Sequence, residues 1–313
     1  MTFTLFWGKW VHFVIYCNVD KAPKQLDMIR GMLMTSRKGN SLIQVLIVIA
    51  ILAILIGLLL PAIQRIRWAA SQMQSMNNLR QINVAVQNYA SQHDEGIPGV
   101  NPPPGPKVYS LFVTILPYIE QGNVYQEIKH AAATGPTNNY VKAYISPSDP
   151  TVRETDKRHG PASYGANYWA FRRGGMSLSA SFQDGTSNTL AFSEHYYRCG
   201  PQQVTFMYQW FGIFPGTGRP ATFADPNEGD PKPITEGSPP TTHASFPTFP
   251  NIPTFQVAPT QLNCLHLVPQ TPHQNGMLVA LMDGSARVMS PSISPATYWG
   301  AITPSGGEVL GDW

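Results

Sequence analysis

Residues Arg37–Pro61 read RKGNSLIQVLIVIAILAILIGLLLP, and this stretch decides the fold. From Leu42 to Leu60 it is apolar except for Gln44 and the small Gly57. As a helix this run extends about 28 Å, close to the ~30 Å hydrocarbon core of a bilayer. The favourable transfer of its Leu, Ile and Val side chains outweighs the cost of one Gln near the end. We therefore predict a membrane-spanning helix rather than a core helix, since core helices rarely stay apolar on every face for so long.

A small residue before the apolar run indicates proteolytic processing. Gly39 follows the basic pair Arg37 and Lys38 directly. A secretory signal carries its small-residue cleavage site after the apolar region instead. Cleavage after Gly39 would therefore leave the helix on the mature protein, with Asn40 as the new N-terminus.

This arrangement resembles the N-terminal motif of type IV pilins and of type II secretion pseudopilins, including secretion protein G. The resemblance implies a prepilin peptidase that cuts after Gly39 and methylates the Asn40 amine, and it matches Pro61 to the family's proline. Asn40 stands where the family usually has Phe, and Gln44 stands where it has Glu. In the family that Glu is thought to pair with the amine of a neighbouring subunit. Gln44 carries no charge, so the ion pair of fibre assembly is missing.

The residues before the span set the expected topology. We expect residues 1–39 to be a leader, with 1–27 a gene-model extension, because Met28, Met32 and Met34 each precede a plausible basic leader. Basic residues before the span favour a cytoplasmic N-terminal side. The expected protein therefore crosses the inner (cytoplasmic) membrane once, with its head outside the cytoplasm and in some cases at the cell surface.

Beyond Pro61 the apolar pattern becomes one-sided, which predicts an amphipathic helix. Apolar residues recur every three or four positions and indicate a stripe packed in a core. The helix should end near His93, where Gly96, Pro98 and Gly99 follow. We expect one helix over 40–95, spanning the membrane to about 60, and a globular head over 96–313. The stripe consists of Ile63, Ile66, Ala70, Met73, Met76, Leu79, Ile82, Val86 and Tyr89.

Several segments of the head resemble a planctomycete family of unknown function that has a pseudopilin-like N-terminus. The resemblance rests on Asn77–Tyr89, on Leu116–Gln121, and on Ser146–Asp149, where the family has Cys in place of Ser146. It also rests on the GGE ending at Gly306 and on an H-x9-D-G motif formed by His273, Asp283 and Gly284.

The segment Phe182–Leu190 suggests a tight turn followed by a strand to Glu194. Gly185 suits positive φ, and the Asp184 carboxylate can accept hydrogen bonds from nearby backbone. One alternative is a cation site formed by Asp184 and Glu194 together with Asn188. We favour the structural turn.

The H-x9-D-G motif coincides with a predicted β-hairpin. An apolar run from Met277 to Met282 is followed by an Asp283-Gly284 turn and a return strand over Ala286–Met289. His273 and Asp283 would lie about 30 Å apart on an extended strand. Both are therefore expected to stabilise turns and strand ends rather than form an acid–base pair.

Composition and cysteine content exclude some classes of protein. Charged residues make up only 12% of the chain and no basic cluster stands out, so we expect no nucleic-acid partner. Outside the cytoplasm Cys199 and Cys264 can form one disulfide, the alternative being two separate thiols. No cysteine pair has zinc-site spacing, and we expect neither a metal nor a cofactor.

Residues 200–262 hold many prolines and predict an irregular excursion. Its acidic residues Asp225, Glu228 and Asp230 could bind calcium, but they lack the order of an EF-hand loop, so we favour a solvated loop.

The sequence therefore predicts an α+β, type IV pilin-like fold, in which a long N-terminal membrane helix packs on an antiparallel sheet with large irregular loops. The expected function is a non-enzymatic structural or secretion-associated role, with a prepilin peptidase, the bilayer and other pseudopilins or secretion machinery as partners. One alternative is an anchored module whose aromatics Trp169, Trp210 and Phe211 bind a polysaccharide or other solute. An enzyme is disfavoured, since the chain has no nucleophile elbow, zinc motif or phosphate loop.

Overall fold

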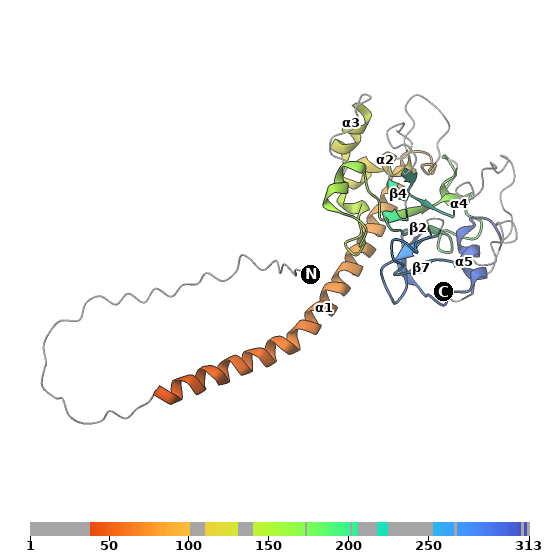
Figure 1. Cartoon of the computed structure of the whole chain (residues 1–313). Helices are drawn as coiled ribbons and strands as arrows, with labels where there is room; N and C mark the ends of the chain where they lie inside the picture. The colour runs from red at the N-terminus through yellow and green to blue at the C-terminus, as the bar shows by residue number, and fades with distance from the viewer. Residues whose placement is uncertain are drawn as a thin grey trace, which may run out of the picture. The chain divides into compact units, whose positions relative to one another are not determined.

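The structure is a computed structural model of the chain. It describes residues 38–100, 110–130, 140–172, 174–200, 202–205, 218–224, 253–265, 268–307 and 310–311 (Figure 1). The chain divides into two compact units, Met1–Leu60 and Pro61–Trp313. Residues 1–37 of the predicted leader and most of the proline-rich excursion lie outside the described residues.

Helix α1 (Lys38–Ser91) is the longest element and is uninterrupted in both units. In the first unit the side chains from Leu42 to Leu60 are exposed on every face. This part is long and apolar enough to cross a membrane. Pro61 is accommodated within the helix, and the helix ends at Ser91, close to the predicted end. Two residues with positive φ, Asp94 (50°) and Glu95 (63°), follow and turn the chain back.

The second unit contains short helices around a central sheet, and the prediction of an α+β class is confirmed. The helical segments are α2 (Leu111–Thr114), η1 (Leu116–Ile119), α3 (Gly122–His130), η2 (Lys142–Tyr144), η3 (Glu154–His159), α4 (Tyr168–Phe171) and α5 (Pro295–Ile302). The strands are β1 (Tyr164–Asn167), β2 (Leu190–Glu194), β3 (Arg198–Cys199), β4 (Gln202–Thr205), β5 (Gly218–Pro220), β6 (Thr222–Phe223), β7 (Gln256–Val257), β8 (Gln270–Thr271), β9 (Met277–Leu281) and β10 (Ala286–Met289).

The central sheet has the strand order β10-β9-β2-β1-β6. The predicted hairpin is present as the antiparallel pair β9–β10, in which Met289 lies opposite Met277. The sequence predicted an antiparallel sheet, and this is wrong at one edge, where β6 pairs with β1 in parallel. β3, β4 and β5 form a second small sheet, and β7 and β8 a third.

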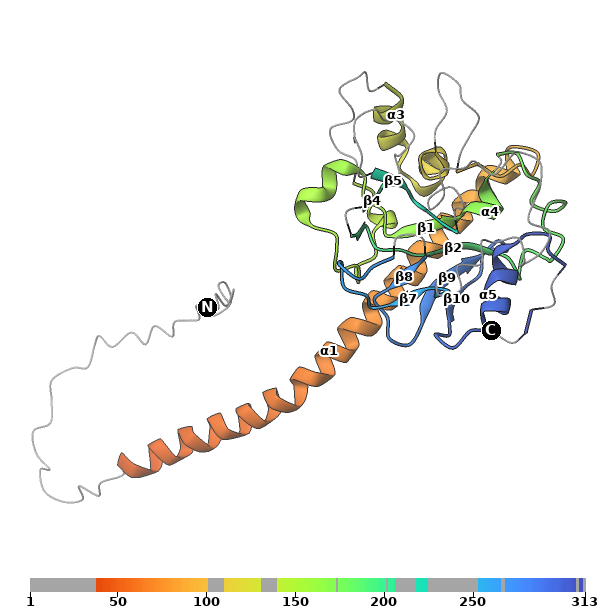
Figure 2. The same cartoon turned by 45° about the vertical axis from the view of Figure 1, so that its right-hand side comes forward.

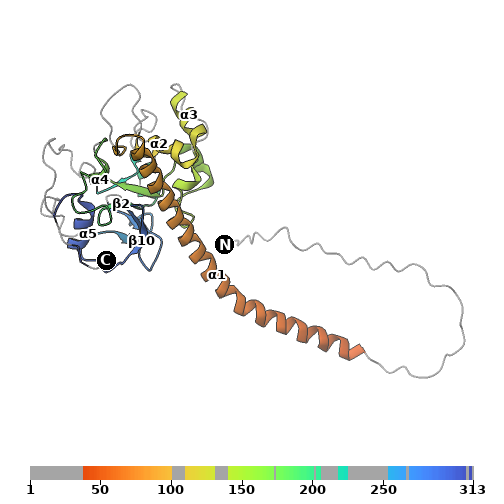
Figure 3. The same cartoon turned by 180° about the vertical axis from the view of Figure 1, so that it is seen from behind.

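The inner strand β9 is buried on both faces, which explains its continuous apolar sequence. Successive side chains of a strand point to opposite faces. Leu278 and Ala280 accordingly join the core that includes α1, whereas Met277, Val279 and Leu281 join a second core with Tyr298 and Ile302 of α5. The sheet is therefore a middle layer, with α1 across one face and α5 against the other (Figures 2 and 3).

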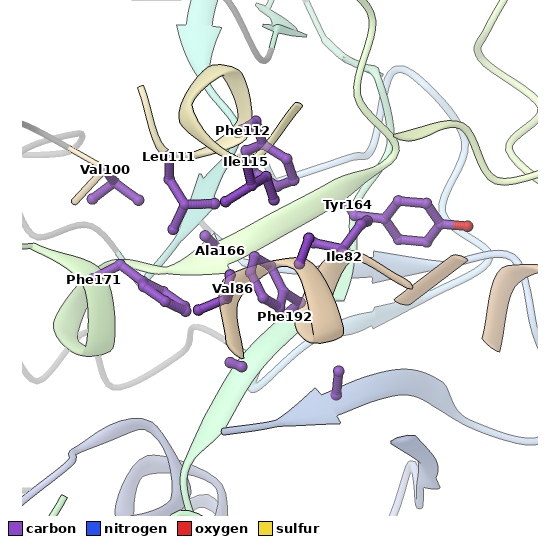
Figure 4. Close-up of a cluster of buried hydrophobic side chains, with 14 of the residues drawn as sticks. Ile82, Val86, Val100, Leu111, Phe112, Ile115, Tyr164, Ala166, Phe171 and Phe192 are labelled. Carbon is purple, nitrogen blue, oxygen red and sulfur yellow. The ribbon is translucent and has the colours of Figure 1, made fainter. Parts of the chain in front are cut away.

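The larger core is formed where α1 crosses the sheet (Figure 4). Ile82 and Val86 of α1 meet Phe192 of β2 and the side chains of Leu111 and Ile115 around α2. All five side chains are completely buried. At about 2 kcal/mol for each large side chain removed from water, such contacts dominate the stability of this unit.

The predicted apolar stripe of α1 is only partly used, and this part of the prediction is wrong. Ile63, Ile66 and Met73 are 46%, 66% and 68% exposed, whereas every stripe residue from Leu79 to Val86 is fully buried. Periodicity indicates which residues share a face, but it does not show how far along the helix the head extends. Here the head first contacts the helix at Trp68 and Ser71, through polar and ring contacts.

Candidate functional site

The motif residues predicted from sequence lie in two groups at opposite ends of β2. Asp184, Gly185 and Asn188 precede β2, and they lie beside Asp283 and Gly284 at the β9–β10 turn. We call these five residues the turn cluster. Glu194 ends β2, and it lies beside His273, which precedes β9. We call Glu194 and His273 the buried pair.

In the turn cluster, the Asp184 carboxylate holds the C-terminal tail. Its two oxygens accept the backbone N–H groups of Gly306 (2.7 Å) and Gly307 (2.8 Å). The Asn188 amide donates to the Asp184 carbonyl at 2.9 Å, and Gly185 adopts φ +94°, which favours glycine. Asp184 therefore has a clear structural role in joining the Asp-Gly turn to the GGE segment.

The second Asp-Gly turn is hydrogen-bonded to the first. Asp283 accepts the Ser285 N–H at 2.8 Å, and its own N–H donates to the Thr186 carbonyl at 3.1 Å. Helix α1 completes the arrangement, because the Asn83 and Gln87 side-chain amides donate to the carbonyls of Leu281 and Met282. The turn cluster thus fixes α1, both turns and the tail in one register.

The buried pair lies inside the protein beneath α1. Glu194 is 1% exposed and His273 is fully buried. The distance from His273 Nε2 to Glu194 Oε1 is 3.3 Å, a contact that is ionic only when the imidazole is protonated, and these atoms do not have hydrogen-bond geometry. The other carboxylate oxygen accepts the Thr271 hydroxyl at 2.6 Å and the Leu278 N–H at 3.4 Å. Buried charged groups usually require such partners.

Helix α1 covers the buried pair with an aromatic ring. Trp68 meets the His273 ring edge-on, with the ring centroids 5.6 Å apart. Four residues further along the helix, Gln72 donates to the Asn275 side chain at 3.3 Å. The turn that carries these contacts needs Gly276, whose φ is +133° and whose missing Cβ would lie 2.2 Å from the Met289 carbonyl oxygen. The Asn275-Gly276 dipeptide was a turn signal that the sequence reasoning missed.

These geometries support the structural reading of the motif residues. Asp184 and Glu194 have separate sets of partners at the two ends of β2, so they do not form the alternative cation site. His273 and Asp283 lie at opposite ends of β9. Among the residues that the structure describes, no three His, Cys, Asp or Glu side chains are grouped to hold a metal ion.

Asp149 is a half-buried carboxylate whose role sequence reasoning did not identify. It accepts the N–H and hydroxyl of Thr151, the Ser163 hydroxyl and the Tyr197 N–H, at 2.6–3.0 Å. Burial raises the pKa of the Asp149 carboxyl above its ordinary 3.8, while the hydrogen bonds from Thr151, Tyr197 and Ser163 oppose this rise. The Asp149-Pro150-Thr151 turn, in which an aspartate accepts the N–H two residues ahead, was the available sequence signal.

Asp149 supports a loop that docks on α1 through hydroxyl and amide groups. The Ser146 hydroxyl is 2.6 Å from that of Ser75, and Ser148 donates to Ser71 at 2.9 Å. Asn78 donates to the Ile145 carbonyl and to the Tyr164 hydroxyl. We call these contacts between residues 71–78 of α1 and the remainder of the head the polar seam. Ser146, the residue that replaces the cysteine of the resembled family, lies at its centre.

The remaining predicted residues are placed as follows. Cys199 and Cys264 form a disulfide, with their Cα atoms 5.1 Å apart. Trp169 is only 4% exposed and packs in the core, so it cannot be part of an exposed aromatic binding surface. Gly39 and Asn40 lie in the first turn of α1, and Gln44 is exposed on it. Trp210, Phe211, Asp225, Glu228 and Asp230 lie outside the described residues.

Comparison with known proteins finds one similarity, which covers part of the chain. Residues 64–179 match the profile of a family described as "Protein of unknown function (DUF1559)". The match begins within α1 and covers Asp149 and the polar seam, but it ends before the turn cluster and the buried pair. No curated protein and no solved structure matches the chain.

Proposed function

We propose that this chain is a membrane-anchored, pseudopilin-like envelope protein with a structural or secretion-associated role and no enzymatic activity. The observation that carries the proposal is α1. One uninterrupted helix is apolar on all faces up to Leu60 and then supplies Leu79, Ile82 and Val86 to the core of the second unit. The anchor and a core element of the second unit therefore belong to one helix.

The proposal includes proteolytic processing at the start of α1. A prepilin peptidase removes residues 1–39 by cleavage after Gly39 and methylates the Asn40 amine. The support is the order of the residues, in which the basic pair and the glycine precede the apolar helix. Gln44 is uncharged, so assembly with other pseudopilins or secretion machinery proceeds without the ion pair that a glutamate would make.

The proposed topology places the N-terminus in the cytoplasm and the head outside it, across the cytoplasmic membrane. Basic residues before the span support this orientation. The disulfide between Cys199 and Cys264 also supports it, because disulfides persist mainly in oxidising compartments.

A non-enzymatic role is supported by the way the polar motif residues are used. The Asp184 and Asp283 carboxylates accept backbone N–H groups, and the buried pair is closed off from solvent. Each group therefore has a role in holding the fold.

The full chain expressed with a prepilin peptidase tests the proposal. We expect a shortened product that stays with the membrane after a carbonate wash, and we expect Gly39→Leu to remain uncut. Gly57→Leu is the matched control, because a side chain there meets nothing within 4 Å, and it should be processed normally. An uncut wild-type chain, or a cut chain released by the wash, would contradict the proposal.

A further inference from the structure

The first two turns of α1 after the span form an exposed basic and aromatic segment. Every residue from Pro61 to Ala70 is exposed. Within this stretch lie Arg65, Arg67 and Trp68, and Trp68 is 41% exposed even though its ring also meets His273. Ile63 and Ile66 add exposed apolar surface. We call Ile63–Trp68 the collar.

The arginines of the collar have no acidic partner on their own helix. No Asp or Glu occurs between Leu42 and His93. Neither guanidinium has a salt bridge or hydrogen bond to any residue that the structure describes. Two exposed positive charges beside a membrane span are therefore available to pair with an external anion.

The spacing along α1 places these charges at headgroup depth. Arg65 and Arg67 follow Leu60 by five and seven residues, about 8–11 Å along a helix. The headgroup layer on one side of a bilayer is about 5–8 Å thick. Side chains of a helix lean toward its N-terminus, and long arginines extend further, so both guanidinium groups reach back to this layer. Tryptophan is enriched at the same level.

We propose that the collar is a lipid-binding surface, in which Arg65 and Arg67 bind the phosphates of anionic lipids while Ile63, Ile66 and Trp68 contact the interface. This rests on the proposed anchoring. A second copy of the chain is the less suitable occupant, because its helix offers only positive charge at this level. Lipid phosphate supplies the complementary charge and balances arginines on the side of the span where basic residues are usually depleted.

The test compares anionic and zwitterionic lipids around the full chain. Wild type, the double variant Arg65→Gln/Arg67→Gln and the control Arg80→Gln are reconstituted in mixed phosphatidylglycerol and phosphatidylcholine bilayers. Retained lipids are then counted by native mass spectrometry. Arg80 is an exposed arginine further along the same helix, beyond the collar, and its guanidinium donates to the Asn77 side chain.

We expect wild type and Arg80→Gln to retain phosphatidylglycerol in preference, and the double variant to lose about tenfold or more of that preference. An equal preference in all three proteins, or none in wild type, would overturn the collar proposal. The variant Ile66→Cys tests for contact between copies of the chain. If it cross-links equally with and without anionic lipid, the collar proposal is overturned in favour of a protein partner. A carbonate wash of the same vesicles separates the two proposals: a wild-type chain that washes off contradicts anchoring, whereas a retained chain without lipid preference contradicts only the collar.

Discussion

Two consecutive parts of α1 are held in the second unit by different forces. Residues 79–90 bury apolar side chains in the main core, including Leu79, Ile82 and Val86. Residues 71–78 contact the head through the hydroxyl and amide groups of the polar seam. A buried apolar side chain contributes about 2 kcal/mol, whereas a typical hydrogen bond contributes about 1 kcal/mol net. The comparison indicates that residues 79–90 supply most of the stability, whereas residues 71–78, nearer the span along the chain, are held in register mainly by hydrogen bonds, as Asn83 and Gln87 are within the apolar part.

The largest expected effect comes from the apolar part. Ile82→Ala should lower the free energy of unfolding of the head by about 2–5 kcal/mol, because it leaves a cavity between α1 and the sheet. Denaturant unfolding of the detergent-solubilised chain measures this. Val84→Ala is the control on the same helix, since Val84 is 49% exposed, and it should change the free energy by less than about 0.5 kcal/mol. Similar values for the two variants would contradict the division.

A smaller effect is expected at Asp149, whose hydrogen bonds hold the loop that forms the polar seam. Asp149→Asn should destabilise the head by about 1–3 kcal/mol, because an amide cannot accept the hydrogen bonds that converge on both carboxylate oxygens. Denaturant unfolding at neutral pH checks this value. A neutral or stabilising result would show that the loop bearing Ser146 does not depend on Asp149.

Asp149 also predicts a pH dependence with a definite sign. Burial raises its folded-state pKa above the ordinary 3.8, so the folded protein binds the proton more readily than the unfolded chain does. Its contribution to stability is therefore complete below about 3.8 and is lost as the pH rises through the raised pKa. Stability curves of wild type and Asp149→Asn over this range should differ by that slope. Parallel curves would contradict the assignment.

The smallest effect is expected within the polar seam itself. Ser75→Ala removes the contacts of this hydroxyl with the Ser146 and Tyr164 hydroxyls and should cost about 0.5–1.5 kcal/mol. Its clearer signature is local: in hydrogen exchange, the amides of residues 71–78 should open at lower free energy than those of 79–90, and Ser75→Ala should widen the difference.

A covalent link across the polar seam sharpens the same comparison. The Ser75 and Ser146 hydroxyls are 2.6 Å apart, so the variant Ser75→Cys/Ser146→Cys should form a disulfide under oxidising conditions. The bond should slow exchange at 71–78 and leave 79–90 unchanged. Uniform protection of both parts in wild type would show that α1 opens as one unit.

The elements that could be predicted from the sequence are those determined by consecutive residues. The apolar run of membrane length and the β9–β10 turn are of this kind, and both are present. The extent of burial along α1 was not predictable, because it depends on where distant loops such as Ser146–Asp149 meet the helix. The pairing of Glu194 with His273 was missed for the same reason, since only the strand order of β2 and β9 brings them together. The parallel pairing of β6 with β1 was not predicted, because β6 lies in the proline-rich excursion, where the sequence shows no clear strand pattern.

Identification of the mature N-terminus tests the central claim most directly. The protein is extracted from the membranes of its native cells, and its N-terminal peptide and intact mass are measured. The account predicts a chain that begins at Asn40, carries one methyl group on the amine, and retains the whole apolar part of α1. A chain that still carries residues before Asn40, or one cut after Leu60 and so separated from its anchor, would contradict it.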